Sequence, residues 1–174
     1  MANESIFSLK NVELFKNLNE DEIKIISKEL KQKDFGANVK VFEEKSIGDE
    51  LYIIKSGGVE ITLIRDESIL VLAELGPYSF FGEMAVLTEK ERSASVTTLK
   101  PCSFLILKRN KLLSLIESYP GVAAKIFKVL AEVLSDRIGK TNENLETYFL
   151  INKAIVDNEQ FRKFYIMSKS QKEK

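Results

Sequence analysis

The apolar positions along this chain change their spacing twice, which divides it into a helical segment, a β segment and a second helical segment. Asn19 and, three residues later, Glu22 predict a capping box near the end of the first segment, residues 1–33. Three apolar residues then recur at the spacing of one buried helix face: Ile23, Ile26 and Leu30. Four earlier residues predict a shorter helix or helical arm: Ile6, Leu9, Val12 and Phe15.

From residue 34 to residue 108, short runs rich in β-branched and aromatic residues replace the helical spacing, which is typical of strands. The runs cover residues 39–41, 51–54, 59–64, 69–75, 93–99 and 103–108. Turn signals separate them, above all Ser56-Gly57-Gly58 and Gly76-Pro77. Strands at about ten-residue spacing with turns between them predict a small antiparallel barrel or jelly roll.

Helical spacing returns in residues 109–150. A short helix is predicted by Leu112, Leu113 and Ile116. A longer one runs from Pro120 to about Leu150, and its apolar stripe comprises Phe127, Leu130, Leu134, Ile138, Thr141, Leu145 and Tyr148. A helix of about 30 residues is about 45 Å long, more than one small barrel can cover. We therefore expect a homodimer through the 121–150 helix, the alternative being a helix that packs only on its own barrel.

The composition excludes several kinds of chemistry. The chain has no histidine and one cysteine, Cys102, which excludes histidine-ligated metal centres, imidazole-dependent nucleophiles and intramolecular disulfides. The apolar neighbours of Cys102 predict a core residue rather than a reactive thiol. We find no other catalytic constellation, so we expect neither a metal nor an enzyme.

Charge and hydropathy bear on partners and location. The 26 basic and 26 acidic residues cancel, which gives no support for nucleic-acid binding. The first residues lack the basic start and apolar run of a signal peptide, and no apolar run is long enough for a membrane span. We expect a cytoplasmic protein with no membrane contact. The short tail, residues 151–174, carries aromatics that predict a docked helix before a polar, disordered end.

The stretch from Phe80 to Val96 has the residue types of an anion cradle. Gly82 permits close approach of the backbone to a ligand. Residues 84–87 predict one helical turn, whose free N–H groups attract an anion. Arg92, followed by three small residues, offers paired donors that suit a buried phosphate.

This stretch resembles the phosphate-binding cassette of the cyclic nucleotide-binding domain family, as found in the catabolite activator protein and in regulatory subunits of cyclic-AMP-dependent protein kinase. The matching residues are Phe81-Gly82-Glu83 and Arg92-Ser93-Ala94-Ser95-Val96. The stretches 48–57 and 14–18 also resemble the family. Together with the strand pattern, the resemblance implies a mainly β α+β fold: an antiparallel eight-stranded jelly-roll barrel, flanked by N-terminal helices and a long C-terminal helix.

The resemblance also implies roles for the residues of the cassette, 81–96. Arg92 would pair with the cyclic phosphate, and Glu83 would accept a hydrogen bond from the ribose 2′-hydroxyl. The N–H groups of Ala85 and Ser93 would complete the cradle. The ligand-binding candidates are Gly82, Glu83, Met84, Ala85, Arg92, Ser93 and Ala94. The alternative is an empty pocket in which Glu83 and Arg92 pair with each other.

The loops depart from the family pattern at Lys45-Ser46, Tyr78-Ser79 and Glu91. These departures put the loop geometry in doubt more than they do ligand binding. The residues that would contact the base of the nucleotide are harder to assign. In the catabolite activator group a Thr-Ser pair on the long helix contacts adenine, and Thr141-Asn142 looks similar. Counting from the cassette instead favours Arg137. A third possibility is that all three are solvated helix residues.

The ligand implied by the resemblance is cyclic AMP or cyclic GMP. A Thr at the position of Ser93 is associated in the family with cyclic GMP, so we favour cyclic AMP. Residues 151–174 are too few for a winged helix-turn-helix. We therefore expect a stand-alone regulatory module that repositions its C-terminal helix for an unknown protein partner. The alternative is a ligand-free relative that serves as a dimeric docking scaffold.

Overall fold

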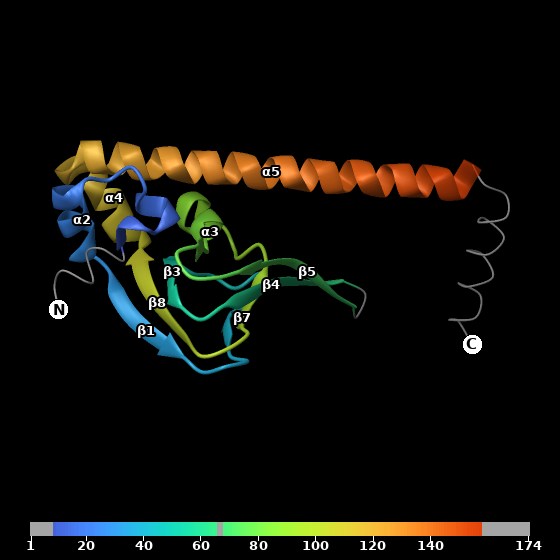
Figure 1. Ribbon diagram of the computed structural model, residues 1–174, viewed down its shortest axis with the longest axis horizontal. Coiled ribbons are helices and arrows are strands. Elements are labelled where there is room, and N and C mark those ends of the chain that lie inside the picture. The colour runs from blue at the N-terminus through green and yellow to red at the C-terminus, as the bar shows by residue number, and fades with distance from the viewer. Residues whose placement is uncertain (1–8, 66–67, 158–174) are drawn as a thin grey trace. The chain divides into compact units, whose positions relative to one another are not determined.

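The computed structural model describes residues 9–65 and 68–157, which form eight strands with helices before and after them (Figure 1). One sheet has the order β1-β8-β3-β6 and the other β2-β7-β4-β5, and neighbouring strands are antiparallel. The strands are β1 (Lys31–Phe35), β2 (Lys40–Phe42), β3 (Glu50–Ser56), β4 (Val59–Arg65), β5 (Ser68–Leu75), β6 (Phe80–Phe81), β7 (Ser95–Thr98) and β8 (Cys102–Lys108).

The strand pairing confirms a mainly β fold but not a closed barrel. Among the described residues no ladder of hydrogen bonds joins one sheet to the other, so each sheet keeps two edges. The six predicted strands are all present, within a few residues of their predicted limits. The β segment begins at Lys31 rather than at residue 34, and it contains two strands that the pattern did not predict, β1 and β6.

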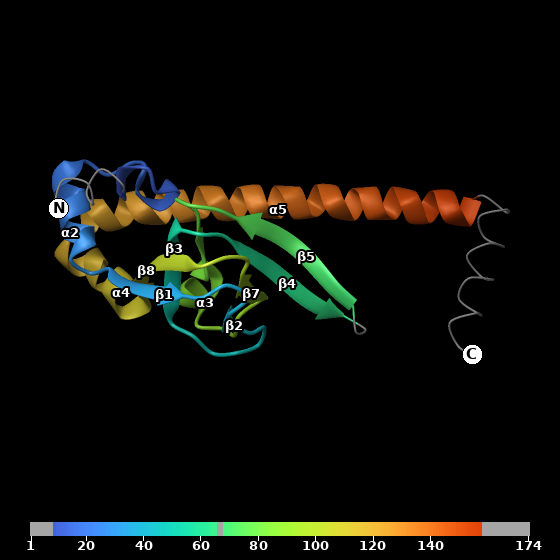
Figure 2. The same cartoon turned by 60° about the horizontal axis from the view of Figure 1, so that its bottom comes forward.

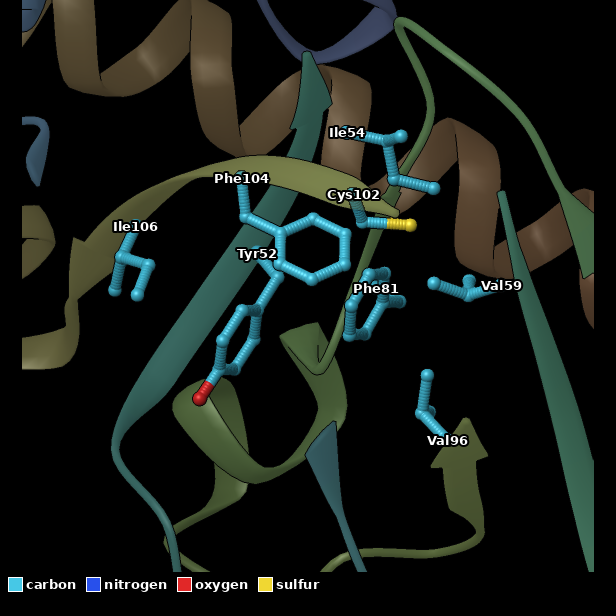
Figure 3. Close-up of a cluster of buried hydrophobic side chains, with 8 residues drawn as sticks. All are labelled: Tyr52, Ile54, Val59, Phe81, Val96, Cys102, Phe104 and Ile106. Atoms are coloured by element: carbon cyan, nitrogen blue, oxygen red, sulfur yellow. The ribbon is translucent and has the colours of Figure 1, made fainter. Parts of the chain in front are cut away.

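The two sheets enclose an aromatic core (Figure 3). The rings of Tyr52 and Phe81 stack with their centroids 5.1 Å apart, and Phe104 meets each of them nearly edge-on. Val59 and Val96 contribute to this core from the other sheet. Such burial of apolar side chains from both sheets is the main force that holds them together.

Cys102 belongs to this core, as predicted, and it fixes the turn between β3 and β4. Its side chain is only 4% exposed, and its Sγ accepts a hydrogen bond from the N–H of Gly58 at 3.2 Å. Gly57 has φ +99°, and a Cβ there would lie 2.3 Å from Cys102 Sγ. The turn therefore requires glycine both for its backbone conformation and for space.

The N-terminal helix and the helix that directly follows the last strand lie at one end of the β segment (Figure 2). The turn η1 (Glu13–Phe15) and α2 (Glu20–Ser27) come before it, and α4 (Arg109–Ser118) and α5 (Pro120–Asp157) follow it. The predicted capping box of α2 is confirmed: Asn19 Oδ1 accepts from the N–H of Glu22, and Glu22 Oε2 accepts from the N–H of Asn19. Part of the predicted arm from Ile6 lies outside the described residues.

The first turns of α5 pack on the N-terminal helix. Ile126 and Val129 are fully buried, and Lys125 Nζ donates to both carboxylate oxygens of Glu22 at 2.7 Å. The hydrogen bond from Lys125, together with that from the backbone of Asn19, lowers the pKa of Glu22. The capping box and the start of α5 are thus coupled through one carboxylate.

The chain divides into two compact units, residues 1–130 and 131–174, and α5 runs across the boundary. It extends to Asp157, beyond the predicted end near Leu150. Within the second unit, Ile138 is 62% exposed and Leu145 61% exposed. The side chain of Tyr148 and the tail from residue 158 lie outside the described part of the structure.

Candidate functional site

The cassette begins where β6 passes into α3 (Glu83–Thr88). The two phenylalanines of β6 pair with Tyr52 and Ile53 of β3, which anchors the start of the cassette in the core. Gly82 then adopts φ +84° as the N-cap of α3. The helical turn predicted for residues 84–87 is confirmed and slightly longer. Glu83 and Ala85 are buried on it, whereas Met84 is 48% exposed.

The guanidinium of Arg92 lies at the centre of this site, and the side chain is only 4% exposed. Nη1 donates to the carbonyl of Gly82 and Nη2 to the carbonyl of Glu50, both at 2.9 Å. Its Cζ lies 4.1 Å from the centroid of the Phe42 ring, a cation–π contact. The start of β3, the start of α3 and β2 therefore hold the guanidinium together.

Two glycines leave the space that the guanidinium occupies. A Cβ on Gly48 would lie 2.6 Å from Nη2, and one on Gly82 would lie 2.7 Å from Nη1. Both distances are shorter than van der Waals contact, so a side chain at either position would displace Arg92. Their positions in the sequence, 34 residues apart, explain why a local pattern does not connect them.

The backbone around Arg92 is fixed by the loop before β3. The N–H of Arg92 donates to the carbonyl of Ser46, and the N–H of Lys45 donates to the carbonyl of Arg92, both at 2.8 Å. The N–H of Glu44 donates to Ser95 Oγ at 2.9 Å. Lys45 and Ser46, which depart from the family pattern, thus form a backbone clamp on the arginine.

The electrostatics of Arg92 are those of a buried cation held by neutral oxygens. Burial lowers the pKa of Arg92, while Tyr52 and the carboxylates of Glu50, Asp49 and Glu83 oppose that shift. Both Nη donors go to carbonyl oxygens, and Nε is buried without a hydrogen-bond partner among the described residues. A buried charge with a remaining donor is stabilised by an anion of the right size.

The other predicted residues of the cassette lie on the same surface or beneath it. Ala94 is 7% exposed, at the entry to β7, while Ser93 is exposed. Ser93 Oγ lies 3.5 Å from Met84 Sδ, which brings the two halves of the cassette together. The structure therefore gathers Gly82, Arg92 and their neighbours, as the sequence predicts.

The candidate base contacts lie in the second unit, and their relation to the cassette stays a prediction. Thr141 and Asn142 are exposed on α5, and Arg137 is partly exposed. Thr141 Oγ donates to the carbonyl of Arg137 at 2.9 Å, so this hydroxyl bonds its own helix. Arg137 and Thr141 lie one helical turn apart, on the same face.

Sequence reasoning assigned no role to three contributors to the site: Phe42, Glu50 and Ser95. Glu50 acts through its backbone carbonyl, for which the sequence carries no signal. Its carboxylate accepts from Tyr52 Oη at 2.6 Å, and burial is the main cause that raises the pKa of Tyr52. Gly48 begins the stretch 48–57 that resembles the family, but its position beside Arg92 depends on the fold.

Comparison with known proteins agrees with this geometry. The model of the family described as "Cyclic nucleotide-binding domain" matches residues 32–119, just over half of the chain. The chain belongs to the cyclic nucleotide-binding domain family. The matched range begins at the second residue of β1. It includes the other seven strands and the whole cassette. The family is a regulatory one rather than a catalytic one.

Relatives of this cyclic nucleotide-binding domain occur in larger proteins. The chain is 32% identical over 133 residues to the CRP-like cAMP-activated global transcriptional regulator of Mycobacterium tuberculosis. The aligned residues make up 76% of this chain and 58% of that regulator. The chain thus spans well under two thirds of that protein.

Solved structures of cyclic nucleotide-binding proteins are also similar to this chain. The catabolite activator protein of Thermus thermophilus is 28% identical, with a TM-score of 0.71, and covers 78% of this chain and 62% of that one. The regulatory domain of Toxoplasma gondii PKA, solved with cAMP, is 28% identical and has a TM-score of 0.58. The alignment covers 63% of this chain and 42% of that one.

Within residues 9–65 and 68–157, no group of three or more His, Cys, Asp or Glu side chains is arranged to hold a metal ion. Over the same ranges, no helix combines the length and the apolar character that a membrane crossing requires.

Proposed function

We propose that the domain binds a cyclic purine mononucleotide with its cyclic phosphate against Arg92. The observation that carries the proposal is the buried guanidinium, which the carbonyls of Gly82 and Glu50 and the Phe42 ring hold in place with Nε still available. A cyclic phosphodiester carries one negative charge, which one guanidinium and a few neutral donors match. The cyclic nucleotide-binding relatives support this assignment.

The remaining contacts follow from the same placement. Glu83, buried at the start of α3, accepts a hydrogen bond from the ribose 2′-hydroxyl. The N–H groups of Ala85 and Ser93 complete the cradle, with Met84 and Ala94 lining it. Thr141, Asn142 or Arg137 contacts the base. Serine rather than threonine at position 93, and relatives whose names mention cAMP, favour cyclic AMP over cyclic GMP.

Equilibrium titration with the two nucleotides tests this function. We expect cyclic AMP to bind with a dissociation constant of about 1 µM or tighter. Cyclic GMP should bind about tenfold more weakly. A preference for cyclic GMP would contradict the base assignment. Binding of neither nucleotide would favour the alternative function, a ligand-free domain that serves as a docking scaffold.

We also propose that two copies pair through residues 121–150 of α5 and that ligand occupancy changes the position of this helix. The exposed apolar side chains Ile138 and Leu145 support such a pairing, because exposed apolar stripes on helices mark contact surfaces. A coupling of about 1–3 kcal/mol between the site and the helix is enough for a switch. An unidentified protein partner would then detect the change.

Replacing Leu145 with aspartate tests the pairing. A charge in an apolar seam should weaken the dimer by at least about tenfold without unfolding the sheets. Thr147→Asp adds the same charge at an exposed position off the stripe, about half a helical turn away from Leu145, and should leave the dimer intact. Sedimentation velocity at micromolar concentration measures both. A monomeric wild-type protein would contradict the proposal. A Leu145→Asp dimer would move the interface elsewhere, with the exposed apolar residues 69–72 of β5 as the next surface.

A further inference from the structure

A cleft with a volume of about 540 Å³ lies beside the edge strand β1, and Arg92 is not among the residues that line it. Three of its lysines come from the neighbourhood of β1 and two from the start of α4: Lys28, Lys31, Lys33, Lys108 and Lys111. Among the described residues that line it, two carry carboxylates, Glu29 and Glu50. Since the whole chain is neutral, the cleft is a local concentration of positive charge.

Both carboxylates of the cleft already have partners. Lys111 Nζ lies 2.9 Å from Glu29 Oε2, and Glu50 Oε2 accepts from Tyr52 Oη at 2.6 Å. The other four lysines form no ion pair with any residue of the described ranges. Four cations at one cleft repel one another, and an anionic partner would relieve that repulsion.

The backbone beside the cleft indicates the form of the partner. β1 stands at the end of its sheet and pairs with β8 alone among the described strands, so its other side is open (Figure 2). Lys31 and Lys33 alternate along it with Gln32 and Asp34. An extended chain added to this edge would place every second side chain on the face of the two lysines.

The lysines have a second explanation that must be weighed. Lysine on an edge strand deters pairing with another strand, which accounts for Lys31 and Lys33 without any partner. It does not account for Lys28 and Lys108, which enter the cleft from other elements and, unlike Lys111, have no carboxylate partner among the described residues.

We propose that this cleft docks an acidic, extended segment of a partner protein, which adds to the edge of β1 with its carboxylates against the lysines. The cleft shares Glu50 with the Arg92 site but is lined by no residue of the cassette, so it provides a place for a partner that the cassette does not. Small anions and nucleic acids share the negative charge but not the ability to continue a sheet.

A fluorescein-labelled octapeptide of alternating Glu and Val tests the proposal by fluorescence anisotropy on the full chain. We expect a dissociation constant of about 100 µM or tighter that rises with added salt. The double variant Lys31→Glu, Lys33→Glu should bind the peptide at least about tenfold more weakly. Hydrogen exchange at the amides of residues 31–35 should slow when the peptide binds, because strand addition covers that edge.

The control variant Lys100→Glu, Lys153→Glu makes the same change in net charge at exposed lysines outside the cleft, and it should bind the peptide like the wild type. Cyclic-nucleotide affinity, measured in parallel, should stay constant in every variant. A constant nucleotide affinity shows that the variant is folded. It also separates a loss of peptide binding at the cleft from a failure of the proposed nucleotide-binding function. Equal loss in the control variant would overturn the proposal. So would tighter binding of inorganic triphosphate or an oligothymidylate than of the peptide, or no peptide binding at all.

Discussion

Replacing Arg92 with alanine should weaken cyclic AMP binding by about 2–4 kcal/mol, or about 30- to 1,000-fold. The cyclic phosphate would lose its one charged partner, and the surrounding carbonyls of Gly82 and Glu50 cannot replace it because they repel an anion. Isothermal titration calorimetry with cyclic AMP measures the change. Thermal unfolding without ligand shows whether the domain is still folded.

Two further variants make this result specific. Arg92→Lys keeps the charge but not the fork of donors, so its affinity should fall between those of the wild type and Arg92→Ala. Arg65→Ala removes an exposed arginine that is paired with Glu44, and it should bind like the wild type. An Arg92→Ala protein with wild-type affinity would show that the phosphate does not lie at this arginine.

Replacing Gly48 with alanine should weaken cyclic AMP binding by about tenfold or more, although Gly48 is not expected to touch the ligand. The new Cβ would lie 2.6 Å from Nη2 and 2.8 Å from Nε of Arg92, so the guanidinium must move away from its position. The clash falls on the end of a flexible side chain. The free energy of unfolding should therefore fall by no more than about 1 kcal/mol.

Gly36→Ala is the matched control for this prediction. A Cβ at Gly36 would lie 3.6 Å from Val39 Cγ2, which is ordinary van der Waals contact, and the site is remote from that turn. Titration and thermal unfolding of both variants distinguish displacement of Arg92 from general loss of stability. Equal affinities of Gly48→Ala and the wild type would mean that the position of the guanidinium does not limit binding.

The sequence predicts the cassette well because its parts are local. Gly82, the helical turn and Arg92 lie within about ten positions of one another, and their residue types follow from anion binding. The groups that position Arg92 come from distant segments. Gly48, the carbonyl of Glu50 and the ring of Phe42 reach it only through the pairing of the sheets, which no local spacing encodes.

In the fold, too, local features are predicted from the sequence and long-range pairing is not. β1 was missed because it is a mostly exposed edge strand with the sequence Lys-Gln-Lys-Asp-Phe, which has no apolar alternation. β6 was missed because two residues are too few to show a period. Six other strands were predicted from their runs, but whether two sheets close into a barrel depends on which strands form hydrogen bonds, and a run of apolar residues does not specify its partner.

The Nε–H group of Arg92 offers the most direct test of where the nucleotide binds. It is buried and has no hydrogen-bond partner among the described residues, so a phosphate oxygen should change its environment strongly. In a ¹⁵N–¹H spectrum recorded during titration with cyclic AMP, its signal should move and its exchange with water should slow, while that of Arg65 stays constant. Saturable binding that leaves the Arg92 Nε–H signal unchanged would contradict the assignment of this cassette as the phosphate site.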